Sequence, residues 1–310
     1  MSKKLGERLK HFTPYKYLVG ILNRIVLPGF EGMTLFHLIE AYVIGIFRGT
    51  LTSRAGSIAY SFFMAIFPAL LFLLNLIPLV PIAEFQDKFM VFIHDVIPRQ
   101  SLVFFEPVFD DISQNPRTGL LSFGAIFALI LMTNGVNAIF SGFEGSFNVH
   151  INRGFLRQYS VALGVAIVLA LLLVTMVTVL IYFEYVLHML RDRNMMSDRT
   201  DVTLVSIGSY VFFVSMIYTV VATLYYFGTK EGRTSKFFSP GALMTTVLFM
   251  LTTYLFGIYI DNFSNYNELY GSIGALLIMM LYIWLNSNLL LLGFELNAVL
   301  QKLKMNQNPQ

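Results

Sequence analysis

The sequence predicts an all-α polytopic membrane protein with six transmembrane helices, an N-terminal interfacial helix and a helical outer loop. Of its 310 residues, 56% are hydrophobic and 13% are charged, which is about half the charged fraction usual in soluble domains. The apolar runs are continuous, and each is about as long as a helix needs to cross a bilayer. Strands of a membrane barrel would instead show short segments of alternating hydrophobicity.

Six apolar segments are long enough to cross the bilayer. They cover residues 57–80, 119–140, 159–187, 202–227, 240–260 and 270–300. The first contains Pro68 in mid-span, and proline removes one backbone hydrogen bond, so we expect a kink there that neighbouring helices stabilise. A packing kink, a moving gate and a cavity wall are all compatible with this proline.

The segments outside the predicted crossings differ in charge. Residues 1–54 are basic, and we interpret them either as an interfacial helix whose cations meet anionic headgroups or as a cytosolic helix packed on the bundle. Residues 55–300 form the membrane domain, with an acidic extracytoplasmic loop at 81–118, and residues 301–310 form a cytoplasmic tail. Fifteen of the 21 Lys and Arg residues lie on the side of the termini, which places both termini in the cytoplasm.

The sequence lacks the common patterns of enzyme and metal sites. It contains no Cys, its five His residues are scattered without metal-ligand spacing, and it has no G-x-S-x-G elbow or P-loop. We therefore expect no cofactor, no metal and no enzyme activity, and these residues do not support ribonuclease chemistry. Nucleic-acid binding is not expected either, because membrane topology already explains the Lys and Arg residues beside the crossings.

The last crossing carries polar residues on two opposite stripes. Glu295 shares one stripe with Gly274, Leu281 and Asn288, and the nearly opposite stripe contains Ser272, Asn286, Gly293 and Asn297. A carboxylate in a membrane helix is unfavourable unless it faces protein or water. We therefore expect this helix to have protein neighbours on both sides. Glycines of the second and last crossings, at 124, 135, 271, 274 and 293, are interpreted as close helix contacts.

Polar residues near the predicted cytoplasmic ends of two crossings give the sharpest site hypothesis. In the second crossing they recur at steps of three or four, which places them on one stripe. We expect one polar vestibule that faces the cytoplasm, lined by Asn134, Asn137, Ser141, Glu144, Asn148, Asn288, Glu295 and Asn297. For Glu144 and Glu295, a proton- or cation-carrying role and a structural role near the interface both remain open.

Five short motifs carry a family resemblance. They are Ala59-Tyr60 with Phe67-Pro68-Ala69-Leu70, the polar run from Asn134 to Asn148, Pro240-Gly241-Ala242, Tyr270-Gly271-Ser272-Ile273-Gly274-Ala275, and Gly293-Phe294-Glu295-Leu296-Asn297-Ala298. Over roughly residues 35–300 the chain resembles the YihY/BrkB family of bacterial inner-membrane proteins, formerly labelled ribonuclease BN. Phe294 departs from the small residue expected in the last motif. The resemblance implies six membrane helices, the bacterial inner membrane and a link to serum resistance and envelope lipids, and it provides no catalytic residues.

The leading functional hypothesis is an inner-membrane protein that moves or shelters an amphiphilic, lipid-like molecule, with membrane lipids as its partners. One alternative is a small-solute or proton-coupled transporter, for which Glu295→Gln or Glu144→Gln would abolish a pH-dependent flux. Another is a non-transporting scaffold in envelope assembly, for which those substitutions would be silent and changes in residues 81–118 would disrupt partner capture.

Overall fold

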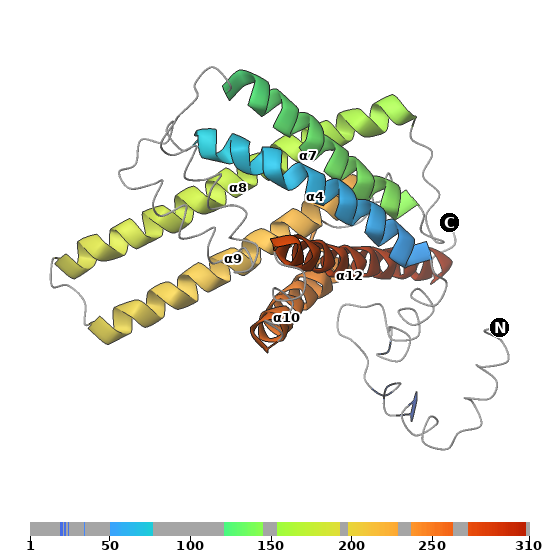
Figure 1. The fold of residues 1–310 in the computed structure, drawn as a ribbon. Coiled ribbons are helices and arrows are strands. Elements are labelled where there is room, and N and C mark those ends of the chain that lie inside the picture. The colour runs from blue at the N-terminus through green and yellow to red at the C-terminus, as the bar shows by residue number, and fades with distance from the viewer. Residues whose placement is uncertain are drawn as a thin grey trace.

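The structure, a computed structural model, describes residues 50–76, 121–144, 154–192, 198–228, 237–262 and 272–307, with a few positions before residue 50. The predicted interfacial helix, the 81–118 loop and Asn148 lie outside these residues. The elements of the described chain are α4 (Thr50–Leu76), α7 (Leu121–Glu144), α8 (Phe155–Asp192), α9 (Asp198–Gly228), α10 (Pro240–Asn262) and α12 (Ser272–Gln307) (Figure 1). The predicted all-α fold class is confirmed.

Five of the described helices are long and apolar enough to cross a membrane. The qualifying spans are Ile126–Glu144, Phe155–Val179, Ile207–Gly228, Pro240–Ile260 and Leu276–Gln301. The sixth helix, α4, has 27 residues, and its side chains are described as far as residue 66. Helix α8 has 38 residues, so at 1.5 Å per residue it is about 57 Å long and extends beyond a hydrocarbon layer of about 30 Å.

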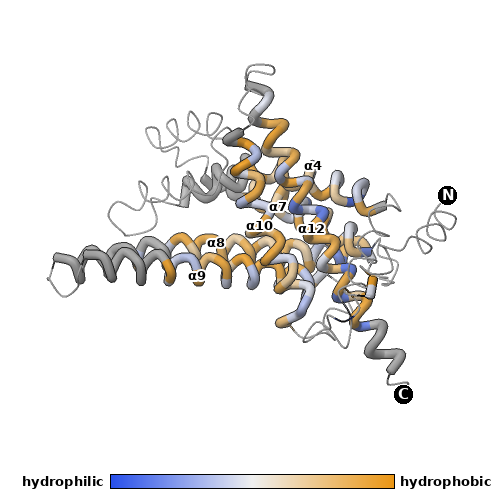
Figure 2. Tube along the Cα trace, turned by 90° about the horizontal axis from the view of Figure 1, so that it is seen from below, coloured by the Kyte–Doolittle hydropathy of each residue, from blue (hydrophilic) through white to orange (hydrophobic). Residues whose placement is uncertain are grey.

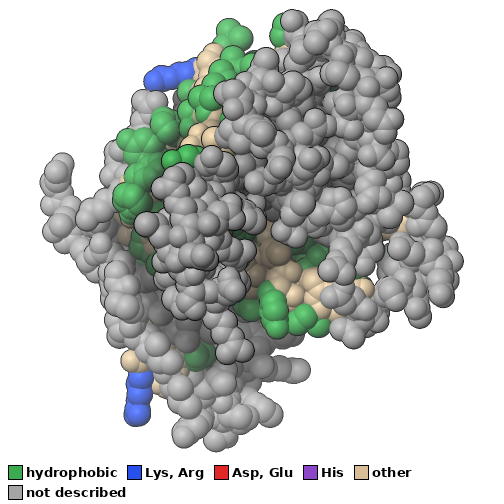
Figure 3. All heavy atoms as spheres, turned by 90° about the vertical axis from the view of Figure 1, so that its left-hand side faces the viewer, with side chains coloured by type: hydrophobic (Ala, Val, Ile, Leu, Met, Phe, Trp, Pro, Cys, Tyr) green, Lys and Arg blue, Asp and Glu red, His purple; other side chains and the backbone are tan. Residues whose placement is uncertain are grey.

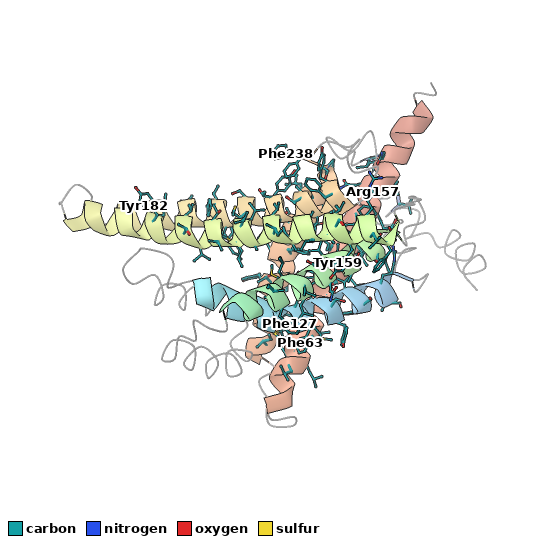
Figure 4. The ribbon with its side chains drawn as sticks, turned by 90° about the horizontal axis from the view of Figure 1, so that it is seen from above. Phe63, Phe127, Arg157, Tyr159, Tyr182 and Phe238 are labelled. Carbon is teal, nitrogen blue, oxygen red and sulfur yellow. The ribbon has the colours of Figure 1, made fainter. Side chains whose placement is uncertain are left out.

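Helix α12 lies at the centre of the arrangement and packs against α4, α7 and α10. Helices α4 and α7 lie against each other, and α7 also contacts α8. Helices α8 and α9 form a long antiparallel hairpin that reaches away from the other helices, with Tyr182 near its far end (Figure 4). The described helices are largely apolar along their length, and the hydrophilic segments concentrate on the side where the C-terminus lies (Figure 2).

Three aromatic rings fill the space between α7, α9 and α12. Phe143 stacks on Phe294 with ring centroids 4.1 Å apart, and the Tyr225 ring lies edge-on to both. Phe294 therefore occupies a packed position in the core at the point where the motif led us to expect a small residue. Gly228 leaves room for this cluster, since a Cβ there would lie 2.6 Å from Cδ2 of Phe143.

The outer surface of the bundle is apolar. Exposed large side chains on α10 follow helical spacing and form one stripe: Leu243, Val247, Leu251, Tyr254, Leu255 and Ile258. On the face shown in Figure 3, the described side chains are mostly hydrophobic. An apolar surface of this extent is unfavourable in water and suits contact with lipid.

Candidate functional site

An ion pair lies where α4, α7 and α12 meet. Nη2 of Arg54 donates to Oε1 of Glu295 at 3.1 Å, and Nη1 of Arg54 donates to the carbonyl oxygen of Gly142 at 2.8 Å. The Arg54 and Glu295 side chains are 14% and 20% exposed. One arginine therefore joins three helices through two charge-assisted hydrogen bonds.

The close approach of α4 and α12 to α7 makes this geometry possible. A Cβ on Gly142 would lie 2.9 Å from Cδ1 of Ile58 and 3.1 Å from Cδ2 of Leu291. Because Gly142 has no side chain, its carbonyl oxygen lies within reach of the Arg54 guanidinium. We name these three residues, Arg54, Gly142 and Glu295, the arginine junction.

Sequence reasoning missed Arg54, because the predicted boundary between the basic segment and the membrane domain falls after it. The structure begins α4 at Thr50, so Arg54 lies inside the helix. The signal was present in the sequence: Leu51, Ala55 and Ile58 are buried and follow helical spacing across Arg54. A lone arginine within such a pattern indicates an inward-facing charge.

The polar stripe of α7 faces α8. Nε2 of Gln158, a buried side chain, donates to Oδ1 of Asn137 at 3.1 Å and to Oγ of Ser141 at 3.2 Å. The hydroxyl of Tyr159, labelled in Figure 4, donates to Oδ1 of Asn134 at 3.1 Å. Three residues of the predicted vestibule therefore contact the neighbouring helix α8.

Asn297 caps the N-terminus of α10. Its Oδ1 accepts the backbone N–H of Gly241 at 2.8 Å, and its Nδ2 donates to Oγ of Ser239 at 2.9 Å. Ser239 is also the N-cap of α10, since its Oγ accepts the N–H of Ala242 at 3.3 Å, and Pro240 takes the first helical position, where proline is favoured. The first turn of α10 is thus fixed by its own serine and by a residue of α12.

A second polar contact joins α9, α10 and α12 deeper in the bundle. The Tyr225 hydroxyl donates to the carbonyl oxygen of Leu290 at 2.7 Å and lies 2.7 Å from Oγ1 of Thr245. Gly293 packs directly against this contact. A Cβ at Gly293 would overlap Oγ1 of Thr245 and lie 2.9 Å from the carbonyl oxygen of Gly241. The prediction that Gly293 allows close helix contact is confirmed. Tyr225 was not singled out from the sequence, where its ring is indistinguishable from those that face lipid.

The predicted vestibule residues divide among several contacts of the described chain. Glu295 faces α4 and Asn297 faces α10, which confirms that α12 has protein neighbours on both of its polar sides. Nδ2 of Asn288 donates within α12 to the carbonyl oxygen of Trp284 at 2.8 Å. Glu144 is half-buried at the end of α7. Pro68 lies within α4, and its side chain is outside the described residues.

Within the described ranges, no group of three or more His, Cys, Asp or Glu side chains lies close enough together to hold a metal ion.

Comparison with known proteins places the chain in a family. The family model described as virulence factor BrkB matches residues 46–310. The chain belongs to the BrkB family. The resemblance stated from the motifs is therefore confirmed for most of the chain, including the arginine junction and the α10 cap.

The BrkB-family chain is similar to several bacterial proteins. It is 30% identical over 263 residues to the ribonuclease-like protein YfkH of Bacillus subtilis, a match that covers 83% of this chain and 93% of that protein. It is 22% identical over 254 residues to a UPF0761 membrane protein of Acinetobacter baylyi, covering 80% of this chain and 58% of that protein. A UPF0761 membrane protein of Psychrobacter is 36% identical over 95 residues, covering 30% and 18% respectively. No solved structure matches the chain.

Proposed function

We propose that this BrkB-family protein binds an amphiphilic, lipid-like molecule of the envelope and moves or shelters it in the bacterial inner membrane. The observation that supports this most is the Arg54–Glu295 ion pair within a largely apolar bundle. Replacing a buried ion pair by apolar residues of similar volume is often neutral or stabilising, so stability alone is a weak explanation for the presence of the pair. Ionisable residues within membrane helices most often serve a function.

The surroundings of the pair suit a molecule that is polar at one end and apolar at the other. Glu295 shares its stripe on α12 with Leu281, which is 40% exposed. Glu295 and Leu281 are 14 positions apart, about 21 Å along the helix, and this distance exceeds the hydrocarbon thickness of one leaflet, about 15 Å. Acyl chains that follow this stripe from a polar head at Glu295 therefore extend toward Leu281 over most of the distance between the two residues.

Reconstituted vesicles test the proposal. Purified protein in liposomes that contain a fluorescent phospholipid is expected to redistribute the lipid between leaflets faster than protein-free liposomes, and Arg54→Gln is expected to slow this. Gly257→Ala is the matched control, because a Cβ at Gly257 meets no atom within 4 Å. If the protein neither binds nor redistributes lipid, the proposal should be abandoned.

Glu295 also supports a second candidate, a small-solute or proton-coupled transporter. This candidate predicts that Glu295→Gln abolishes a pH-dependent flux and leaves lipid redistribution unchanged. Both candidates move molecules without making or breaking covalent bonds, so we infer that the protein is not an enzyme. Metal-dependent cleavage of RNA that persists through repeated purification would contradict this inference.

A further inference from the structure

We propose that the arginine junction binds a zwitterionic headgroup that carries both a phosphate and a primary ammonium group, as in phosphoethanolamine. This inference rests on the proposed function and names the class of molecule that the same site would take. The headgroup enters between Arg54 and Glu295 and replaces their 3.1 Å contact with two contacts of its own.

The two charges of the junction favour a ligand that carries both a negative and a positive group. A guanidinium binds phosphate through parallel N–H···O bonds, and a carboxylate accepts hydrogen bonds from an ammonium. An anion that took the place of Glu295 at Nη2 of Arg54 would remove the carboxylate from its contact with the guanidinium. A cation bound to Glu295 would likewise remove the Arg54 guanidinium from its contact with the carboxylate. Separating one partner of a partly buried ion pair is unfavourable, and a headgroup with both charges avoids the penalty on either side.

The contact with Gly142 fixes the phosphate-binding half of the site. Nη1 of Arg54 donates to the Gly142 carbonyl oxygen, and Nη2 makes the contact with Glu295. The first hydrogen bond does not depend on the second, so the guanidinium stays attached to α7 when Glu295 changes partner. The two side chains are 14% and 20% exposed, so neither is sealed inside the bundle.

The depth of the junction matches a lipid headgroup. Arg54 follows the first residue of α4 by four positions, and Gly142 precedes the last residue of α7 by two. At 1.5 Å per residue these offsets are about 6 Å and about 3 Å. The headgroup layer adds about 5–7 Å to each side of the hydrocarbon core. On α12, Glu295 precedes the last residue of the apolar span Leu276–Gln301 by six positions, about 9 Å. The junction therefore lies near the ends of α4 and α7 and close to the end of the apolar span of α12, within a few ångströms of the headgroup layer.

Lipid binding by the full chain tests this inference. Delipidated protein is incubated with phosphatidylethanolamine, phosphatidylglycerol or a trimethylammonium lipid of identical acyl chains, and the retained lipid is measured by native mass spectrometry. We expect phosphatidylethanolamine to be retained about tenfold more than either of the others, which corresponds to a difference of about 1.4 kcal/mol in binding free energy. Soluble phosphoethanolamine should compete with it, and glycerol phosphate should not.

Two variants test the direction in which the preference among headgroups should change. Glu295→Gln leaves Arg54 as the charged residue of the original pair, so the preference should shift from phosphatidylethanolamine to phosphatidylglycerol. Arg54→Gln combined with Glu295→Gln should remove the preference between headgroups, and Gly257→Ala should retain the preference of the wild type. Equal retention of all three lipids by the wild type would overturn the inference while leaving the proposed function intact. Retention of none of the three lipids would contradict both the inference and the proposed function.

Discussion

Replacing Gly293 by Ala tests the close crossing of α10 and α12. The added Cβ would overlap Oγ1 of Thr245 and lie 2.6 Å from the Tyr225 hydroxyl and 2.9 Å from the Gly241 carbonyl oxygen. Because one of these atoms belongs to the backbone, the helices must separate or the Tyr225 contacts must break. Overpacking costs about 1–3 kcal/mol, and two interhelical hydrogen bonds at about 0.6 kcal/mol each add about 1. We therefore expect a loss of about 2–4 kcal/mol in the free energy of unfolding.

The single tryptophan of the chain provides the assay. Trp284 lies in α12 and packs against the core, so its fluorescence reports unfolding by dodecyl sulfate in mixed micelles. The expected loss lowers the folding equilibrium constant by about 30- to 1,000-fold, since each 1.4 kcal/mol is a factor of ten. Gly257→Ala should leave stability unchanged or raise it slightly, because alanine favours the helix and the site is open. Equal stability of Gly293→Ala and the wild type would refute the crossing described above.

Three further predictions concern the cap on α10, the contact between α7 and α8, and the membrane topology. Asn297→Ala leaves the Gly241 N–H uncapped and should lower the free energy of unfolding by about 1–2 kcal/mol in the same titration. Gln158→Ala removes two hydrogen bonds between α7 and α8 and should lower it by about 1 kcal/mol. Because the chain has no native Cys, Ser235→Cys and Ser264→Cys should react with impermeant maleimides from opposite sides of the membrane, the first from the cytoplasm.

Control variants test the physical reason given for each of these predictions. Asn297→Asp retains an oxygen acceptor for the Gly241 N–H and should recover part of the stability lost in Asn297→Ala. If both variants are equally unstable, the cap is not the cause. Ser160→Ala is the control for Gln158, since Ser160 is exposed and its hydroxyl donates to the carbonyl oxygen of Leu156 within α8. An equal effect of the two substitutions would contradict the interhelical role of Gln158. Labelling of both cysteine variants from one side would contradict the predicted topology.

Hydropathy predicts the crossings well because every turn of a helix in the hydrocarbon layer requires mainly apolar side chains. The fifth crossing was predicted at residues 240–260 and is Pro240–Asn262 in the structure, since Pro240 marks the first helical turn. The predictions were less accurate where helices continue into water. Helix α8 extends to Asp192, five residues past the predicted end at 187, because hydropathy locates the end of the hydrocarbon layer and polar residues can continue a helix beyond it.

The candidate site was predicted only in part, because helical periodicity gives the direction of a side chain and not the identity of its neighbour. It correctly separated Glu295 and Asn297 onto opposite sides of α12. It did not indicate that Glu295 pairs with Arg54, 241 positions away in the chain. It also grouped Asn137 with Glu295, although Asn137 contacts α8. Those partners depend on tertiary packing, which the sequence pattern of one helix does not contain.

The cap on α10 has a consequence for how the protein is made. The Gly241 N–H is satisfied by a side chain 56 positions later in the chain. At about 5–20 residues per second, the ribosome reaches Asn297 roughly 3–11 seconds after Gly241. During that interval, the first turn of α10 has Ser239 as a cap but lacks its second one. The order of synthesis therefore makes α12 the helix that completes its predecessor, and a chain released before α12 is inserted leaves α10 unfinished at the membrane surface.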